Sequence, residues 1–356
     1  MDVFDVWLEA LTAKQSLLFC IICKRLTERN IRYVLTTRRY DYVISLLKKQ
    51  NINFIPFGRY GGLTKEEKLE ASIKRMYKLF NFFRKNLPRV HVSFTSPDST
   101  RVAYGLGIPI ILLTDSPHSK IVNRLTLPLA NKIIIPKCTY EEFLKYRIRG
   151  ETEIISFNGV FEIIWTKNFK PKKKILGKLK PYSYVILRLE ETKASYYPMR
   201  KSPTYMDFII DYLLDRGVKI LLYPRYSDQK AHIQNKYKNF LNKLLVIPRY
   251  ATDLQTLEYY SLMVITGGTS IAHEASLLGV PSITLFPYLL SVTRYIIQQG
   301  FPLFKPTSKE EILDLIQDIL ENNSSYRIKE EELTHLQDKM ENPLNLILEN
   351  IRTYIE

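Results

Sequence analysis

The sequence predicts an α/β protein built from two doubly wound domains. Short apolar, β-branched runs alternate with longer segments of helical period, the pattern of parallel strands joined by crossover helices. This alternation stops at a stretch rich in Lys, Gly and Pro at residues 158–181, and then starts again. A chain of 356 residues with 46% hydrophobic residues is long enough for two ordinary cores.

The first half of the chain contains seven apolar runs that we predict to be strands. They span residues 5–9, 31–37, 52–57, 90–94, 109–114, 132–136 and 153–157. Residues 40–50 and 65–86 have the apolar period of helices. Together these segments predict an N-terminal Rossmann-like domain over residues 1–157, followed by a linker over residues 158–181.

The second half repeats the pattern with five predicted strands. They span residues 184–190, 218–224, 244–248, 262–268 and 281–287. Helical segments are expected at residues 206–217, 253–261 and 308–323. We expect a C-terminal Rossmann-like domain over 182–340 and a final helix over 341–356. Because open parallel sheets bind ligands at the carboxyl ends of their strands, two such domains predict one central cleft between them.

The charge of the chain favours an anionic partner. Lys and Arg number 52 against 36 Asp and Glu, which gives a net charge of +16. Nucleotides and phospholipid headgroups would fit this charge, and a generally basic proteome is the alternative explanation. Nucleic acid is not an expected partner, because no module interleaves basic residues with exposed aromatic ones.

Cysteine usage and hydropathy limit the cellular compartments in which the protein is expected. Cys20, Cys23 and Cys138 lack the paired Cys-x-x-Cys pattern of a zinc site, so we expect reduced thiols, no metal and no cofactor. The apolar run at residues 17–23 is far shorter than the roughly 20 residues that span a bilayer, and no signal-peptide cleavage pattern follows it. We expect a cytoplasmic protein, soluble or peripheral to the inner face of the cell membrane.

The strongest site signal is the segment VITGGTSIAHEASLLGVPSITLFP at residues 264–287. Gly267 and Gly268 allow a sharp turn after a strand, and Thr269 or Ser270 can cap the next helix. The free N–H groups and positive dipole end of such a helix bind diphosphate. Glu274, one turn further, could accept hydrogen bonds from two ribose hydroxyls. The alternative is an ordinary capped turn, because Ser270 and Glu274 are close to capping-box spacing.

These residues carry a family resemblance. Residues 267–270 (Gly-Gly-Thr-Ser), Glu274 and residues 278–281 (Leu-Gly-Val-Pro) resemble the nucleotide-sugar loop of GT-B glycosyltransferases, especially the peptidoglycan N-acetylglucosaminyltransferase, and of non-hydrolysing UDP-N-acetylglucosamine 2-epimerases. Further blocks are similar to a mostly archaeal family of predicted glycosyltransferases, domain of unknown function 354 (DUF354). They lie at residues 93–130, 184–197, 221–229 and 340–351. The resemblance covers nearly the whole chain and implies a GT-B-like fold.

The resemblance implies that the C-terminal domain holds a nucleoside diphosphate sugar, with UDP as the expected nucleotide. The residues against the diphosphate would be Gly267, Gly268, Thr269 and Ser270. Glu274 would contact the ribose, and residues 246–255 would form the base pocket. Arg188 and Arg225 each follow a predicted strand, where a guanidinium can pair with phosphate oxygens, and a surface position is the alternative for each.

The acceptor side requires a catalytic base. Sugar transfer with inversion needs a group that deprotonates the acceptor hydroxyl, and positive groups that stabilise the departing diphosphate. Asp115 ranks first as the base, followed by His118 and Asp98. The alternatives are a helix N-cap for Asp98 and a local hydrogen-bond network for His118. Lys14, in the first strand–helix loop, could hold a phosphate or point into solvent.

The chain departs from the resemblance at two places. Relatives often have a histidine in the first loop, where this chain has Lys14 and Gln15. The nearest family often has an acidic residue near the position of Ser116 or Pro117. This chain lacks that acid unless Asp115 takes its place. We expect a metal-independent glycosyltransferase that moves N-acetylglucosamine or a similar sugar to an acceptor, for which a lipid phosphate at the membrane surface is a candidate. The alternatives are an enzyme like the 2-epimerases and a non-catalytic relative that binds nucleotide sugars.

Overall fold

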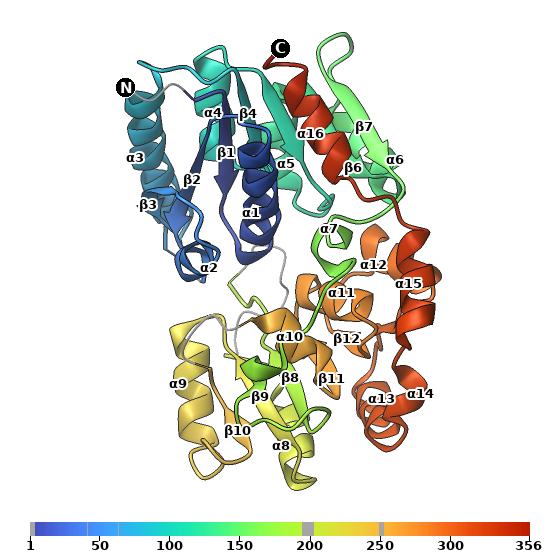
Figure 1. Ribbon diagram of the computed structural model, residues 1–356. Coiled ribbons are helices and arrows are strands. Elements are labelled where there is room, and N and C mark those ends of the chain that lie inside the picture. Colours follow the sequence, from blue (N-terminus) through green and yellow to red (C-terminus); the bar gives the residue numbers. More distant parts are fainter. Residues whose placement is uncertain (1–3, 41, 63, 194–202, 249–252) are drawn as a thin grey trace. The chain divides into compact units, whose positions relative to one another are not determined.

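The computed structural model describes residues 4–40, 42–62, 64–193, 203–248 and 253–356. The chain forms two compact units (Figure 1). Unit 1 comprises Met1–Trp165 and Met340–Glu356, and unit 2 comprises Thr166–Lys339. Each unit is a parallel sheet with helices packed on it, so the predicted fold class, an α/β protein with two doubly wound domains, is confirmed.

The sheet of unit 1 has the strand order β3-β2-β1-β4-β5-β6-β7, and every described pairing in it is parallel. The strands are β1 Val6–Ala10, β2 Tyr33–Arg39, β3 Ile55–Arg59, β4 Val90–Ser93, β5 Ile110–Leu113, β6 Lys132–Pro136 and β7 Glu153–Phe157. All seven overlap the predicted runs, because a sheet buried on both faces needs continuous apolar strands. The order reverses at β1, which pairs with both β2 and β4.

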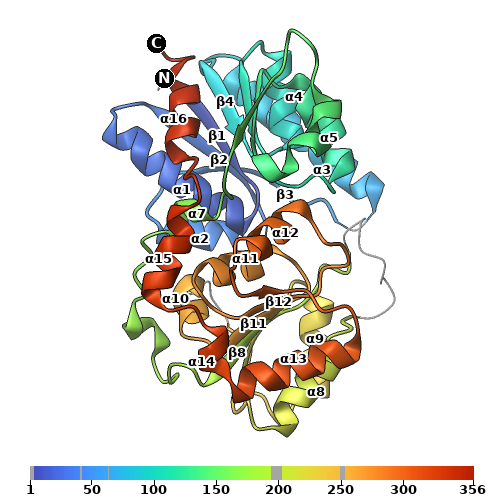
Figure 2. The same ribbon diagram turned by 90° about the vertical axis from the view of Figure 1, so that its right-hand side faces the viewer.

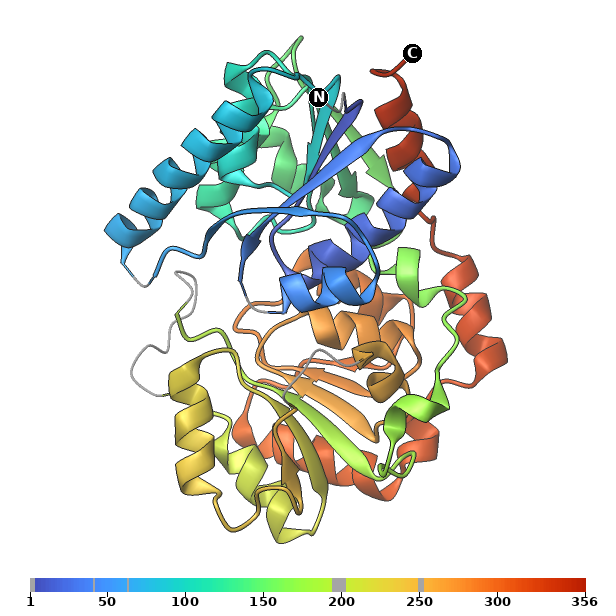
Figure 3. The ribbon, with the colours of Figure 1, turned by 60° about the vertical axis from the view of Figure 1, so that its left-hand side comes forward.

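Helices cover both faces of this sheet. They are α1 Ala13–Glu28, α2 Val43–Lys49, α3 Lys65–Phe83, α4 Pro97–Gly105, α5 Lys120–Thr126, α6 Tyr140–Phe143, α7 Ile163–Thr166 and α16 Leu344–Arg352. Figure 2 shows α1, α2 and α16 on one face and α3, α4 and α5 on the other. Figure 3 shows α1 and α2 next to each other. Each face has its own apolar core, with Leu8 and Ile22 in one and Trp7 stacked on Phe83 in the other.

The sheet of unit 2 has the order β10-β9-β8-β11-β12-β13 and is also parallel throughout the described residues. The strands are β8 Tyr184–Arg188, β9 Lys219–Tyr223, β10 Leu245–Val246, β11 Met263–Thr266, β12 Ser282–Thr284 and β13 Leu303–Phe304. The order reverses at β8, which pairs with β9 and β11. The first five were predicted, whereas β13 was missed because its two apolar residues lie in the short stretch FPLFKP between two prolines and not in a longer apolar run.

The helices of unit 2 also lie on two faces. They are α8 Asp207–Asp215, α9 Ser227–Lys236, α10 Leu254–Tyr259, α11 Ser270–Leu277, α12 Ser291–Gln298, α13 Lys309–Glu321, α14 Asn323–Tyr326 and α15 Glu330–Asp338. Apolar side chains of α8, α9 and α13 pack on one face, and those of α10 and α11 pack on the other. Short 3₁₀ helices occur at Leu127–Leu129, Lys137–Thr139, Leu144–Tyr146 and Lys173–Leu176.

The stretch at residues 158–181, expected to be a linker, contains packed side chains. The two units divide between Trp165 and Thr166. Phe161 and Trp165 are buried in unit 1, and Leu176 is buried in unit 2. The sequence-based expectation gave weight to the Lys, Gly and Pro residues of this stretch and too little to the apolar residues between them.

The C-terminal helix α16 belongs to unit 1. Leu344, Ile347 and Ile351 are buried in the same core as the side chains of α1, and Lys132 Nζ donates to Asn350 Oδ1 at 2.9 Å. The helix was predicted over residues 341–356, but its periodicity alone does not identify the sheet on which it packs.

In the described part of the chain, no helix has the length and apolarity needed to cross a bilayer. Cys20 and Cys23 lie in α1 and are almost fully buried. Burial raises the pKa of the Cys20 thiol to about 12, so this side chain packs as an uncharged core residue.

The buried His91 gives unit 1 a testable pH dependence. His91 is 0% exposed in β4, and its Nδ1 lies 3.1 Å from the carbonyl oxygen of Trp7, to which the neutral ring donates. Burial lowers the pKa of His91 to about 3. The unfolded chain therefore binds a proton below about pH 6.5 that the folded chain does not bind, and His91 alone should lower the free energy of unfolding by about 2 kcal/mol between pH 7 and pH 5.

Urea unfolding at these two pH values, followed by tryptophan fluorescence, tests this expectation. The His91→Gln variant should lose most of that pH-dependent difference, whatever its stability at pH 7. His335→Gln, which replaces an exposed histidine, is the matched control. An unchanged pH dependence in His91→Gln would show that His91 does not cause it.

Candidate functional site

Several of the predicted site residues lie at the places where the strand order of each sheet reverses. Ligands bind open parallel sheets at such switch points, beyond the carboxyl ends of the strands. In unit 1, the first turn of α1 after β1 contains Lys14, and the first turn of α4 after β4 contains Asp98. In unit 2, Arg188 ends β8 and the two glycines follow β11. Both sheets therefore present polar residues at this edge.

The glycine pair of unit 2 allows two other groups to approach the backbone closely. A Cβ atom added to Gly267 would lie 2.3 Å from the Cβ of Glu190, and one added to Gly268 would lie 2.9 Å from Nη2 of Arg225. The N–H of Gly267 donates to the carbonyl of Arg188 at 3.0 Å. Larger residues at these positions would displace the loop after β8 or the guanidinium of Arg225.

The N-terminus of α11 lacks a side-chain cap. Thr269 occupies the N-cap position, but its side chain accepts no hydrogen bond from the helix, and Ser270 is the first helical residue. A capping box formed by Ser270 and Glu274 is therefore not the structure adopted. Because the first N–H groups of a helix have no intrahelical acceptor, those of α11 are directed toward the open end of the glycine turn.

Two arginines of unit 2 follow strands near this turn: Arg188 ends β8, and Arg225 follows β9. Arg188 is 5% exposed, and its Nη1 donates to the carbonyl of Pro224 at 3.1 Å. Arg225 Nε donates to the carbonyl of Leu189 at 3.1 Å, and its Nη1 lies 3.3 Å from Glu191 Oε2. The guanidinium of Arg225 lies against Gly268. Arg188 pairs in the sheet with Thr266, the residue before the glycine pair.

A buried pair of glutamates lies behind the helix start. Glu274, on α11, is 7% exposed, and Glu258, on the neighbouring α10, is 0% exposed. Neither carboxylate oxygen of Glu258 has a hydrogen-bond partner among the described residues. Burial, and then the charges of Glu274 and Asp253, raise the pKa of Glu258 well above its usual value. Glu258 is therefore expected to be protonated at neutral pH, while Glu274 is the acid nearer the surface.

The base pocket expected at residues 246–255 falls partly on residues 249–252, which lie outside the described residues.

In unit 1, Lys14 bridges two acids from distant parts of the chain. Its Nζ contacts Oδ2 of Asp115, after β5, and lies 2.7 Å from Oε1 of Glu162, which is 0% exposed. Burial alone would lower the pKa of Lys14, but the charges of Asp115 and Glu162 outweigh it and raise that pKa above the usual value. Asp115 also accepts a hydrogen bond from Ser116 Oγ at 2.9 Å. Lys14 is thus a fixed cation within the site, not a solvated surface residue.

A second ion-pair group lies beside the first. Arg75, on α3, is 1% exposed and contacts Oε1 of Glu9 through Nη2 and Oδ2 of Asp98 through Nη1, the latter at 3.2 Å. Thr36 and Ser72 donate hydrogen bonds to Glu9 and Asp98 respectively. Asp98 is the second residue of α4, whose N-cap is Ser96, so the N-cap alternative for Asp98 is wrong.

His118 lies in the loop between β5 and α5, three residues after Asp115. Burial lowers the pKa of His118, partly opposed by the charge of Asp115, so its imidazole is neutral at pH 7. A neutral imidazole can accept a proton. Asp115, which contacts Lys14, and His118, three residues further along the same loop, therefore remain the two candidate bases.

The structure brings some of the predicted residues together and adds others. In unit 2 Arg225 lies beside Gly268, and in unit 1 Lys14 contacts Asp115. Asp98 belongs to the separate Arg75 group. The site residues that sequence reasoning missed are Glu9, Arg75, Glu162, Glu190 and Glu258. A charged residue inside an apolar run, as in VWLEA and VFEIIW, was the available signal for two of them.

Several solved structures share this architecture. The UDP-GlcNAc 2-epimerase of Neisseria meningitidis, bound to UDP-GlcNAc, is similar with a TM-score of 0.74 and 14% identity, covering 98% of this chain and 99% of that chain. The UDP-GlcNAc 2-epimerase of Methanocaldococcus jannaschii, in complex with UDP-GlcNAc and UDP, gives a TM-score of 0.74 at 15% identity with the same coverage. MurG of Acinetobacter baumannii gives 0.53 at 12% identity, covering 99% and 100%. These similarities show a GT-B-like fold.

Sequence comparison agrees with the fold. An uncharacterized protein of Methanocaldococcus jannaschii is 28% identical over 361 residues, covering 99% of both chains. The family model described as "Protein of unknown function (DUF354)" matches residues 4–356. The predicted resemblance is therefore confirmed, and the chain belongs to the DUF354 family.

Proposed function

We propose that this protein is a metal-independent glycosyltransferase that uses a nucleoside diphosphate sugar as donor. UDP is the proposed nucleotide and N-acetylglucosamine, or a sugar close to it, the proposed donor sugar. The observation that carries the proposal is the uncapped N-terminus of α11 after the Gly267–Gly268 turn, with the guanidinium of Arg225 against Gly268 and Arg188 at the end of the neighbouring strand β8. A helix N-terminus and paired arginines are the groups that stabilise a diphosphate, both when it binds and when it departs as a leaving group.

The donor would bind along α11. Gly267, Gly268, Thr269 and Ser270 would surround the diphosphate. Arg188 and Arg225 would neutralise its charge in place of a metal ion, and Glu274 would accept hydrogen bonds from the ribose hydroxyls. The neighbouring Glu258 is compatible with this role, because its raised pKa keeps it uncharged at neutral pH and so adds no second negative charge beside Glu274.

Unit 1 would supply the base for the acceptor hydroxyl. We propose Asp115 for this role and His118 as the second candidate. Lys14 holds Asp115 in place through a direct ion pair, so the carboxylate needs little reorganisation when the reaction occurs. Lys14 would also lie close to phosphate oxygens that approach Asp115.

A 2-epimerase-like activity is the second candidate. The similarity to two 2-epimerase structures gives only the fold, but the four carboxylates of the Lys14 and Arg75 groups provide the acids and bases that elimination and re-addition on a sugar would need. Conversion of UDP-N-acetylglucosamine with no acceptor present would favour this candidate over sugar transfer.

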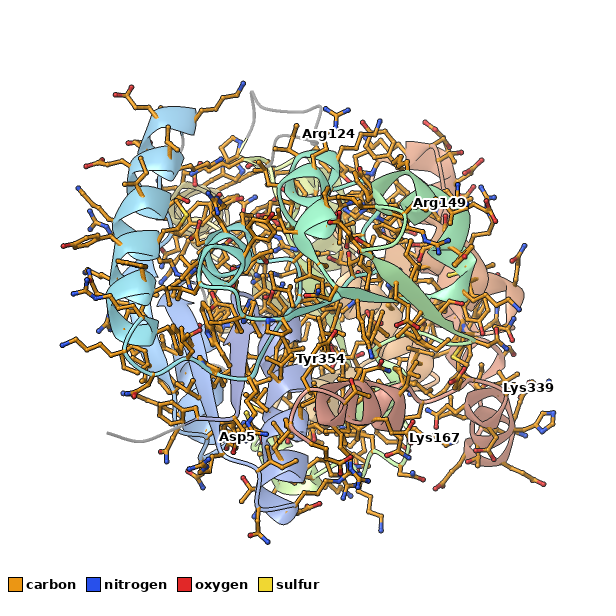
Figure 4. The ribbon with its side chains drawn as sticks, turned by 90° about the horizontal axis from the view of Figure 1, so that it is seen from above. Asp5, Arg124, Arg149, Lys167, Lys339 and Tyr354 are labelled. Carbon is orange, nitrogen blue, oxygen red and sulfur yellow. The ribbon has the colours of Figure 1, made fainter. Side chains whose placement is uncertain are left out.

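For the acceptor we propose a lipid-linked molecule presented at an anionic membrane surface. The outer side of α3 exposes apolar side chains at helical spacing, namely Leu69, Ile73, Tyr77 and Phe80. On α5, Ile121 and Leu125 are also exposed. Exposed Lys74, Lys78 and Arg124 accompany them, and α3 and Arg124 lie at the margin of unit 1 in Figure 4. Apolar side chains with basic neighbours suit a surface of anionic headgroups.

Thermal unfolding with added nucleotides tests the donor site. A ligand at about 100 times its Kd should stabilise unit 2 by about 2.7 kcal/mol. We expect this stabilisation with UDP and UDP-N-acetylglucosamine and expect Glu274→Ala to raise the Kd at least about tenfold, because hydrogen bonds to a charged acceptor contribute about 1.5–3 kcal/mol.

Glu332→Ala, which removes an exposed acid from α15, is the matched control and should bind nucleotide like the wild type. If no nucleotide or nucleotide sugar stabilises the wild type, the glycine turn has no donor-binding role and the proposal fails.

A further inference from the structure

The side chain of Arg38 is a cation without an ion-pair partner among the described residues. It lies at the edge of the unit 1 sheet formed by the carboxyl ends of the strands, the edge that Lys14 and Asp98 also follow. It lies at the carboxyl end of β2, beside the ends of β1 and β3. The guanidinium makes no hydrogen bond and no ion pair with any described residue, and its Nε is buried. An arginine that is partly buried usually pairs with a carboxylate, because an uncompensated charge is costly to remove from water.

Among the described residues, the carboxylate whose charge acts on Arg38 is that of Asp98, and it is already engaged. Asp98 contacts Arg75, which also contacts Glu9. Burial, and then the charge of Arg75, lower the pKa of Arg38, and Asp98 only partly offsets them. Arg38 is therefore a positive group that its own surroundings leave undercompensated, beside a site already proposed to act on phosphorylated molecules.

Two tyrosines flank this guanidinium. Tyr40 follows β2 and Tyr60 follows β3, and their rings stack with centroids 4.7 Å apart. The Cζ of Arg38 lies 5.3 Å from the centroid of Tyr40 and 5.1 Å from that of Tyr60. Lys68, on α3, places its Nζ 5.9 Å from the ring of Tyr60. The cluster combines two cations, two aromatic faces and two phenolic hydroxyls.

We propose that Arg38, Tyr40 and Tyr60 form the subsite that binds the phosphoryl group of the acceptor, a phosphate ester of a sugar or of an isoprenoid lipid. The subsite rests on the proposed function for its role in acceptor binding. The guanidinium can donate two parallel hydrogen bonds to phosphate oxygens. The rings provide an apolar face for the group attached to the phosphate, and Lys68 adds a second charge.

The neighbouring Arg39 provides a matched control. Successive side chains of a strand point to opposite faces, and Arg39 is exposed whereas Arg38 is partly buried. Arg38→Gln and Arg39→Gln therefore remove the same charge from adjacent positions, and only the first alters the proposed subsite.

Calorimetric titration can compare the wild type and both variants. The probes are glucose 1-phosphate, farnesyl phosphate and vesicles containing phosphatidic acid. We expect the wild type to bind at least one of the two soluble phosphate esters, Arg38→Gln to bind it at least tenfold more weakly, and Arg39→Gln to bind within about twofold of the wild type. Preference for glucose 1-phosphate would identify a free sugar phosphate as the ligand, and preference for farnesyl phosphate together with the vesicles would identify a lipid phosphate.

Two results would overturn the subsite: equal binding of the soluble esters by the wild type and Arg38→Gln, or no binding of any probe by the wild type. UDP binding in the same preparations separates this proposal from the proposed function, because Arg38→Gln leaves unit 2 unchanged. Retained UDP binding without ester binding would refute the subsite alone, and ester binding without UDP binding would refute the donor assignment.

Stability without ligand separates a binding role from a structural one. If the role of Arg38 is to bind an anionic ligand, Arg38→Gln should leave the unfolding temperature of unit 1 unchanged or raise it. The reason is that the substitution removes an undercompensated cation. If Arg38→Gln unfolds at a clearly lower temperature than the wild type and Arg39→Gln does not, the guanidinium mainly supports the two tyrosine rings.

Discussion

Replacing Arg75 with methionine is expected to destabilise unit 1 by about 3–5 kcal/mol, because it leaves two buried carboxylates without their cation. Glu9 and Arg75 are 0% and 1% exposed, and Asp98 is 9% exposed. Methionine keeps much of the aliphatic volume of the arginine stem, so loss of charge rather than loss of packing dominates. Trp7 and Trp165 are the two tryptophans and both belong to unit 1, so urea unfolding followed by their fluorescence measures this unit.

Lys74→Met is the matched control for this change. Lys74 precedes Arg75 on α3, and it pairs with Glu70 at the surface, where both side chains are more than half exposed. Exposed pairs contribute little, so the control should stay within about 0.5 kcal/mol of the wild type. Adding Glu9→Gln and Asp98→Asn to Arg75→Met should recover at least half of the loss. A loss below about 1 kcal/mol in Arg75→Met would show that water or other groups already compensate the two acids.

The fold could be predicted from the sequence because its signals are local. The strand β5, for example, coincides with a continuous apolar run, and the helices between strands show their own period. What failed was also local: β13 has only two residues, and the packed apolar side chains of residues 158–181 lie among Lys, Gly and Pro. Contacts with distant residues determine which core α16 joins, and the sequence of α16 alone does not predict those contacts.

The candidate site was predictable only where it is contiguous. The glycine turn, the start of α11 and Glu274 fall within eight residues of sequence. The partner of Lys14 at Glu162 lies 148 residues away, and Glu9 and Arg75 are 66 residues apart. No sequence spacing predicts either contact, because the topology of the sheet, and not the periodicity of a single helix or strand, brings these side chains together. Arg38 likewise becomes conspicuous only once the carboxylates around it are seen to be engaged.

Replacing Asp115 with asparagine is expected to lower kcat by about 10²–10⁴-fold, the usual contribution of a general base, while the Kd for UDP stays within about twofold. Asparagine retains the shape of the side chain and the hydrogen bond from Ser116, but it cannot take the proton of the acceptor hydroxyl. The measurement is the rate of UDP release from UDP-N-acetylglucosamine with glucose 1-phosphate as acceptor, because its sugar hydroxyls carry the proton that the base must remove, together with a separate titration of UDP. Separating kcat from UDP binding is essential because Asp115 lies in unit 1 and the proposed donor site lies in unit 2.

Glu162→Gln is the matched control, because Glu162 is the other acid on Lys14 and is fully buried. It should cost stability and change kcat less than Asp115→Asn does. His118→Gln decides between the two candidate bases. If kcat survives in Asp115→Asn but falls in His118→Gln, the neutral imidazole takes the proton, and the ion pair of Lys14 with Asp115 serves to position the loop after β5. If both variants lose kcat together, the two side chains act as a unit, with Asp115 orienting or charging the imidazole, and their effects should be far from additive in the double variant.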